Sequence, residues 1–223
     1  MFLNTCLFQL FMAKGSIVLK KKQWLNIVAP KEFGGMEMGE TYISEPEEAI
    51  GKTLFVSLAN LMGDYQKQSI NIKFRIINHE NGLLNTVFEG YFMTPSSVRK
   101  LVRKAKDKMD DSFPVKTADN VSLRIKIVMV TKSRTKGSIL AALKKNAREI
   151  MAKLVGSLSL EMFAKEVSIH KIQQSLSKEL RKTYPLSICE IRLAEISKDQ
   201  KKTEENVEPV SEVVNQSAEK AAV

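Results

Sequence analysis

The stretch that most constrains how this chain folds is residues 113–151, FPVKTADNVSLRIKIVMVTKSRTKGSILAALKKNAREIM. Side chains alternate between the two faces of a strand, so Leu123, Ile125 and Ile127 fall on one face, and Arg124 and Lys126 on the other. Residues 131–136 (TKSRTK) then carry three cations and little that could pack. The pattern predicts strand, turn, strand, basic loop and basic amphipathic helix. Such an arrangement suits the presentation of charge to a polyanion better than the construction of a catalytic pocket.

The segments before this stretch predict further strands. Residues 53–60 and 69–77 alternate apolar and polar side chains around a turn at residues 62–67, which predicts a hairpin. An Asn-Gly pair at residues 81 and 82 predicts a second tight turn, and residues 84–93 form the returning strand. Residues 46–50 suggest a short helical turn, and residues 33–39 a loop. Long strands with one polar face favour an antiparallel sheet curled into a barrel-like core.

Helices are predicted around and after these strands. Thr94 followed by Pro95 indicates a helix start, and we expect one helix with its apolar stripe running from Val98 to Met109. Ser138 is the expected cap of the helix in residues 138–154. Two short amphipathic helices follow in residues 160–167 and from residue 168 to Tyr184, and residues 186–196 form the last strand.

These segments define an α+β fold, with an antiparallel β-barrel-like core flanked by basic amphipathic helices, in a single domain over residues 20–196. Residues 1–19 are interpreted as an N-terminal extension, either flexible or the product of a wrongly assigned start codon. The apolar residues 1–11 lack the basic region of a secretory signal and are too short to span a bilayer, so we expect no membrane association. Residues 197–223 are rich in Glu, Lys, Gln and Ser, which predicts a disordered tail.

The net charge indicates the kind of partner. It is +10 for the whole chain, and since the tail carries −2, residues 1–196 carry +12. Excess positive charge favours nucleic acid or an anionic membrane as partner. The cations cluster in sequence at residues 20–22 before Trp24, at residues 99–108 and at residues 132–148. Lysines beside an indole suit phosphate contact combined with base stacking, although a solvated charge run is an equal explanation for residues 20–22.

No motif in the chain indicates catalysis or a metal site. Residues 50–53 (IGKT) resemble the end of a phosphate-binding loop, but Pro46 stands where that loop needs glycine. His79 and His170, the two histidines, lie on separate predicted elements. Cys6 and Cys189 offer neither a disulfide framework nor metal-ligand spacing. We therefore expect no enzyme, no catalytic residue, no metal and no cofactor.

Several segments resemble a known family. They are residues 21–34 (KKQWLNIVAPKEFG), 39–76, 93–110 (MTPSSVRKLVRKAKDKMD), 115–136 (VKTADNVSLRIKIVMVTKSRTK), 142–151 and 184–192. Their content, order and spacing resemble the small-subunit ribosomal protein family S-one-e, also called S-three-A-e, of the archaeal type. The resemblance covers most of residues 20–192.

The resemblance implies a structural constituent of the small ribosomal subunit in the cytoplasm. It implies ribosomal RNA and neighbouring platform proteins as partners, with mRNA near its exit as a further one. The family's basic positions correspond to Lys21, Lys22, Lys31, Lys52, Lys67, Arg75, Arg99, Arg103, Lys104, Lys132, Arg134, Lys136, Lys145 and Arg148. The local charge pattern adds Lys20, Trp24, Lys100 and Lys144 to the predicted RNA-binding set. A free single-stranded RNA-binding protein is the alternative function.

Overall fold

The computed structural model describes residues 21–102 and 104–197. The strands are β1 (Gln23–Val28), β2 (Glu37–Ile43), β3 (Thr53–Ser57), β4 (Ile70–Glu80), β5 (Leu83–Met93), β6 (Lys108–Lys116), β7 (Ser122–Thr131) and β8 (Leu186–Ile196). The α-helices are α2 (Leu58–Met62), α3 (Pro95–Leu101), α4 (Gly137–Gly156), α5 (Leu160–Ser168) and α6 (Lys171–Leu180). Three short 3₁₀ helices are η1 (Lys31–Phe33), η2 (Pro46–Ala49) and η3 (Tyr65–Lys67).

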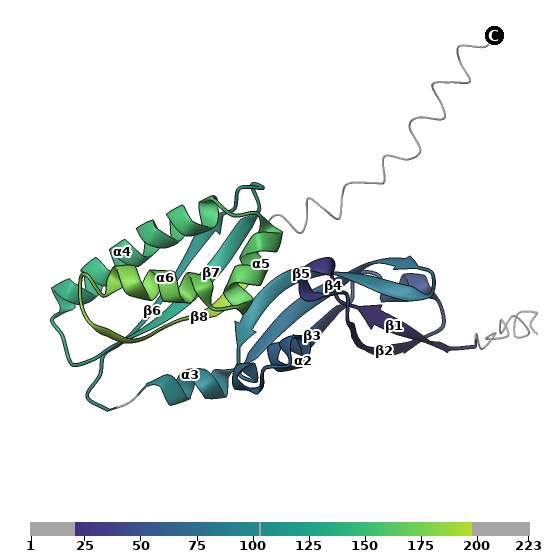
Figure 1. Cartoon of the computed structure of the whole chain (residues 1–223), viewed down its shortest axis with the longest axis horizontal. Helices are drawn as coiled ribbons and strands as arrows, with labels where there is room; N and C mark the ends of the chain where they lie inside the picture. Colours follow the sequence, from purple (N-terminus) through teal and green to yellow (C-terminus); the bar gives the residue numbers. More distant parts are fainter. Residues whose placement is uncertain (1–20, 103, 198–223) are drawn as a thin grey trace, which may run out of the picture.

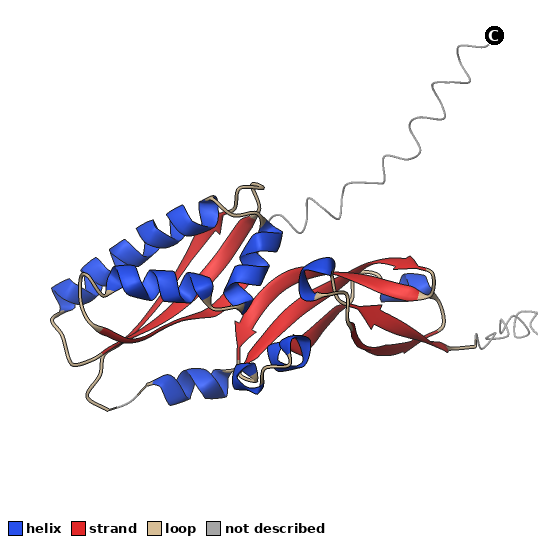
Figure 2. Ribbon diagram, viewed as in Figure 1, coloured by secondary structure: helices blue, strands red, loops and turns tan. Residues whose placement is uncertain are grey.

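Two lobes lie side by side (Figure 1). The first lobe, residues 21–93, contains β1 to β5 with α2, and the second lobe, residues 104–197, contains β6 to β8 with α4, α5 and α6. Helix α3 connects them. The three long helices of the second lobe cover one face of its strands (Figure 2). The α+β class is therefore as predicted.

The sheet is open, so the expectation of a closed, barrel-like core was wrong. Its order is β2-β1-β5-β8-β7-β6, and β4 and β3 branch from β5. Along one side, β5 pairs with β4; along the other it pairs first with β1 and then with β8. Because β2, β3 and β6 each end the sheet without pairing with one another, the described strands do not close. The sheet is also mixed, since β1 runs parallel to β5.

Alternating burial explains why the central strands were predictable. In β4, Ile70, Ile72, Phe74 and Ile76 are buried while the side chains between them are partly exposed. β4 pairs antiparallel with β3 and with β5, which confirms both hairpins. Asn81 and Gly82 in the second turn have φ of 52° and 80°, the left-handed values that an Asn-Gly turn supplies.

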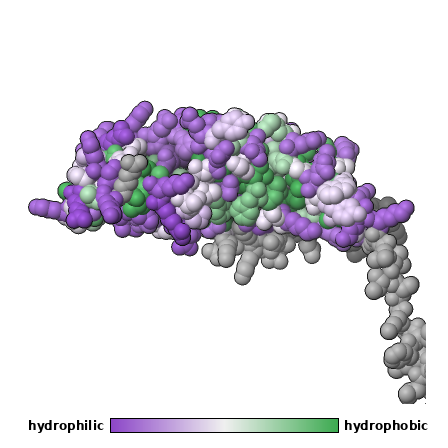
Figure 3. All heavy atoms as spheres, turned by 90° about the horizontal axis from the view of Figure 1, so that it is seen from below, coloured by the Kyte–Doolittle hydropathy of each residue, from purple (hydrophilic) through white to green (hydrophobic). Residues whose placement is uncertain are grey.

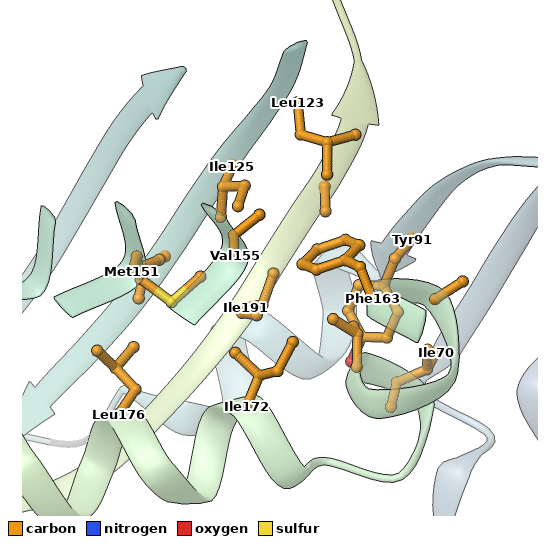
Figure 4. Packing of buried hydrophobic residues seen from close by; sticks show 14 of the residues in the cluster. Ile70, Tyr91, Leu123, Ile125, Met151, Val155, Phe163, Ile172, Leu176 and Ile191 are labelled. Atoms are coloured by element: carbon orange, nitrogen blue, oxygen red, sulfur yellow. The ribbon is translucent and has the colours of Figure 1, made fainter. Parts of the chain in front are cut away.

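One hydrophobic core joins the two lobes. Met151 and Val155 of α4 pack with Leu123 and Ile125 of β7, and Phe163 of α5 lies against Tyr91 of β5 (Figure 4). All six side chains have less than 1% of their surface exposed to solvent. The relative position of the lobes is therefore fixed by packing, not only by the connection through α3.

Several predicted boundaries were wrong. β1 lies where no strand was predicted, and β2 begins inside the predicted loop of residues 33–39. The strand expected over residues 53–60 ends at Ser57, and α2 begins at the next residue. Helix α3 starts at Pro95 after Thr94, as expected, but ends at Leu101. Ala105 has a φ of 64°, which a helix cannot contain.

The start of α4 also differs from the prediction. The capping position is Lys136, whose side chain makes no capping hydrogen bond, and Ser138 lies inside the helix. The helices predicted over residues 160–167 and from residue 168 to Tyr184 correspond to α5 and α6, and the predicted last strand corresponds to β8. Residues 1–20 and 198–223 lie outside the described residues, so the extension and the tail remain predictions.

Gly90 allows the two lobes to meet. A Cβ atom there would lie 2.9 Å from the Ala194 carbonyl oxygen of β8 and 2.9 Å from a ring carbon of Phe92. We predict that Gly90→Ala lowers the free energy of unfolding by about 1–3 kcal/mol, because backbone has to shift. The matched control is Gly137→Ala, where the new methyl group meets nothing within 4 Å. Urea unfolding of both variants checks this; equal stability would show that β5 and β8 are not closely apposed.

Candidate nucleic-acid interface

Positive charge is divided unequally between the lobes. Residues 21–93 contain seven lysines and arginines against nine aspartates and glutamates, a net charge of −2. Residues 94–197 contain 22 lysines and arginines against ten acidic residues, a net charge of +12. The second lobe with α3 therefore carries the positive charge that the sequence assigned to the whole domain. A polyanion is attracted to that lobe.

Three loops meet at one end of the second lobe. They are residues 104–107 before β6, residues 132–136 between β7 and α4, and residues 181–185 between α6 and β8. The backbone N–H of Lys132 donates to the Pro185 carbonyl (3.2 Å), and the Ser133 and Tyr184 hydroxyls lie 2.8 Å apart. The backbone N–H of Thr135 donates to Oδ2 of Asp107 at 2.7 Å. These bonds fix three segments that are far apart in sequence.

We call this surface the cationic end. Its cations are Lys104, Lys106, Lys132, Arg134, Lys136, Arg181 and Lys182. Asp107 is the acidic residue within these loops, and its carboxylate accepts hydrogen bonds from the Thr135 backbone and hydroxyl. None of the seven cations forms an ion pair with another described residue; Lys106 donates to the Ser187 hydroxyl at 2.8 Å. Their charge is therefore available to phosphates.

Sequence reasoning missed Lys106, Arg181 and Lys182. Lys106 was placed on a helix that ends before it, and the Arg181–Lys182 pair stood alone at the end of a helix. Only the hydrogen bonds between loops show that these residues adjoin residues 132–136. The side-chain amide of Asn146 in α4 also donates to the Thr183 hydroxyl (3.1 Å), which attaches the loop of residues 181–185 to α4.

Some predicted RNA-binding residues hold the fold together instead. Arg148 donates two hydrogen bonds of 2.7 Å to Asp111 of β6, whose side chain is 7% exposed. Arg75, together with Lys73, pairs with the buried Glu89 at 2.9 Å. A carboxylate with so little exposure needs such partners. These arginines therefore have a structural function irrespective of RNA.

The remaining predicted residues lie in several places. Arg99 and Lys100 are exposed on α3, and Lys145 is exposed on α4 with Lys144 half-buried beside it. Lys67 of η3 lies 3.6 Å from Asp64. Lys21, Lys22, Lys31 and Lys52 are exposed on the first lobe, outside the three loops of the cationic end. Lys20 and Arg103 lie outside the described residues.

Trp24 and Tyr42 form an exposed aromatic pair on the β1–β2 ribbon. They are cross-strand neighbours with ring centroids 4.9 Å apart, and 63% and 51% of their surfaces are exposed. The ammonium group of Lys22 lies 5.7 Å from the Tyr42 ring centroid. Exposed rings beside a lysine can stack on unpaired bases. Phe33 cannot do so, because it is buried against Phe74.

The described residues contain no converging catalytic or metal-binding cluster. Within residues 21–102 and 104–197, no three His, Cys, Asp or Glu side chains could hold a metal ion together. His170, in the second lobe, lies 3.5 Å from Glu190, while His79 lies near the end of β4 in the first lobe. Burial raises the pKa of the Cys189 thiol to about 12, so it is not a nucleophile at neutral pH. No helix in the described ranges is long and apolar enough to cross a membrane.

The charge of the second lobe favours a polyanion as partner. Comparison with known proteins agrees: the chain belongs to the Ribosomal S3Ae family, whose model matches residues 14–200. Membership of a ribosomal protein family confirms the prediction of a non-enzymatic protein.

Curated relatives cover most of the chain. The small ribosomal subunit protein eS1 of Desulfurococcus amylolyticus is 31% identical over 172 residues, which span 77% of this chain and 81% of the relative. The proteins of the same name from Methanothrix thermoacetophila and Saccharolobus islandicus are each 29% identical. The alignment with the former spans 79% of this chain and 84% of the relative, and with the latter 83% and 91%. All three organisms are archaea, as the archaeal-type resemblance predicted.

The Arg148–Asp111 pair makes stability depend on pH. Hydrogen bonding to Arg148 holds the pKa of Asp111 below its ordinary value of 3.8. A depressed folded-state pKa contributes stability above the unfolded pKa, and that contribution disappears as pH falls through the folded value. We predict that Arg148→Gln destabilises the protein at neutral pH and that its deficit shrinks below about pH 4.

Urea unfolding between acidic and neutral pH measures this deficit. Lys145→Gln, on the same helix but exposed and without an ion pair among the described residues, serves as control and should change stability little at any pH. A deficit for Arg148→Gln that stays constant down to the lowest pH would show that the pair is not formed in solution.

Proposed function

We propose that this protein is a structural constituent of the small ribosomal subunit, works in the cytoplasm and takes part in translation. It binds ribosomal RNA on the platform, near the mRNA exit, beside neighbouring platform proteins. Support comes from its membership of the Ribosomal S3Ae family and from relatives named small ribosomal subunit protein eS1. The observation that carries the RNA-binding part is the +12 charge of residues 94–197, which form α3 and the second lobe, with seven cations at the cationic end.

The mechanism follows from the charge and the rigidity of the loops. Lysines and arginines neutralise phosphates and release counterions, a contribution that does not depend on base sequence. Hydrogen bonds accepted by the Asp107 carboxylate and the Pro185 carbonyl, and one between the Ser133 and Tyr184 hydroxyls, hold the loops in place. The backbone that carries the cations therefore loses little conformational freedom on binding. Arg99 and Lys100 on α3, with Lys144 and Lys145 on α4, extend the binding surface beyond the cationic end.

The first lobe contributes differently. Its net charge of −2 makes it a poor partner for phosphates as a whole, but Lys21 and Lys22 adjoin the exposed Trp24–Tyr42 pair. This pair favours contact with unpaired bases, such as those of mRNA near its exit. The same observation supports the alternative function, a free single-stranded RNA-binding protein, which would not be a stoichiometric component of the subunit.

Salt-dependent RNA binding tests the cationic end. We predict that Lys132→Gln/Arg134→Gln lowers affinity for a small-subunit ribosomal RNA fragment and reduces the slope of log K against log salt by about 1.4–1.8, or roughly 0.7–0.9 for each lost phosphate contact. Lys116→Gln/Lys153→Gln removes the same charge from exposed positions outside the three loops and serves as control. If both double variants change the slope equally, binding depends on net charge alone and the cationic end is not the interface.

Co-sedimentation tests the assignment to the ribosome. We expect the protein in stoichiometric amount in small subunits purified from growing cells at high salt. Its presence only in the soluble fraction would contradict the ribosomal role and favour the free RNA-binding protein. Substitution of both histidines should leave incorporation unchanged, because neither lies in one of the three loops of the cationic end.

A further inference from the structure

A groove of about 630 Å³ lies between α6 and the first half of β8. Helix α6 and the two residues that flank it line the groove at spacings of three and four positions, from His170 through Gln173 and Ser177 to Arg181. The opposite wall consists of residues 187–190 of β8, and Lys67 of η3 adds to the lining. Its volume is in the range of about 300–1,000 Å³ that ligand-binding clefts occupy.

The wall formed by β8 is a strand edge. Four consecutive residues line the groove, whereas a strand face would contribute only every second residue. β8 pairs with β7 along its length, but with β5 only through residues 193–195, because β5 ends at Met93 and the chain turns into α3. Among the described strands, residues 187–190 therefore have a partner on one side only. Backbone N–H and C=O groups of such an edge are a template for another strand.

The charge around the groove selects the kind of strand. Lys178 and Arg181 are exposed at one end and form no ion pair with a described residue. Glu190 is the acidic side chain of the lining, and it lies 3.5 Å from His170. An extended peptide with acidic side chains complements both the edge and the charge. RNA could use the cations, but its backbone has no regular set of amide donors and acceptors to pair with a strand edge.

We propose that residues 207–214 of this chain (VEPVSEVV) bind in the groove as an added strand beside β8. Glu208 and Glu212 supply negative charge, and Val207, Val210 and Val213 are β-branched residues that favour extended structure. Pro209 has no N–H, which an edge strand tolerates when that position faces away from its partner.

The length of the chain permits this placement. Nine residues lie between Ser197, which follows β8, and Val207, and the ten steps from one to the other span about 33 Å when extended. The path back along β8 from Ile196 to Cys189 covers seven residues, or about 23 Å. The segment thus reaches the free edge in the antiparallel direction, and its covalent attachment gives it a high effective concentration there. Once bound, it would reduce the charge of Arg181 that faces RNA at the cationic end.

Zero-length coupling of carboxylates to amines in the full-length, RNA-free protein tests the proposal. We expect mass spectrometry to find Lys178 coupled to Glu208 or Glu212 several times more often than Lys171, which lies on the same helix and pairs with Glu166. Coupling of the tail carboxylates equally to Lys178, Lys153 and Lys116 would overturn the proposal, since it would show no preferred site.

Hydrogen exchange gives a second readout. Glu208→Lys/Glu212→Lys should speed amide exchange in residues 187–190 by about three- to tenfold, the effect expected of two exposed charge pairs. Glu204→Lys/Glu205→Lys makes the same charge change outside the segment and should leave those amides unchanged. Equal exchange in all three proteins would overturn the proposal, as would protection of these amides that appears only when a ribosomal RNA fragment is added. Because the first measurements contain no RNA, they are independent of the proposed ribosomal function.

Discussion

The structure depends on the position of β8 between β7 and β5. This strand, last in the chain, pairs with β7 over nearly its full length and with β5 through residues 193–195. The close approach of the Gly90 backbone to Ala194 makes the second pairing possible. Around it, Ile191 of β8, Phe163 of α5 and Tyr91 of β5 belong to one buried cluster. A lobe that is neutral to acidic is thereby joined rigidly to a strongly basic one.

The consequence is a molecule whose surfaces differ in character. The second lobe presents cations on loops held by Asp107 and Tyr184, whereas the first presents an aromatic pair and many acidic side chains. The face seen from below is hydrophilic toward both ends and more hydrophobic in its middle (Figure 3). Arg75 and Arg148 neutralise the poorly exposed carboxylates of Glu89 and Asp111 and so add little to the cationic surface. Net charge alone therefore overstates the charge available to RNA.

The sequence predicted those elements whose structure is determined by the pattern of their own side chains. Alternation identified β4 and β7, because the burial of their side chains follows the local periodicity, and the Asn-Gly turn identified the β4–β5 hairpin. The sequence did not predict elements whose structure depends on contacts between residues far apart in the chain. Met109 fits the apolar stripe of a helix, yet it lies in β6, where it pairs with Met129 of β7. β1 was missed because its parallel pairing with β5 has no local signal, and that pairing makes the sheet mixed instead of antiparallel as predicted. The site shows the same limit: the cations could be counted, but neither the convergence of three loops nor the partners of Arg75 and Arg148 could be inferred.

We infer that a rigid two-lobed scaffold presents its positive charge to RNA from one lobe. Mapping photo-crosslinks between ribosomal RNA and individual residues in assembled small subunits tests it most directly. We expect crosslinks to concentrate in residues 99–108, 132–148 and 178–182, with few in the first lobe beyond the Trp24–Tyr42 pair. Crosslinks spread evenly over both lobes, or concentrated on β3 and β4, would contradict it.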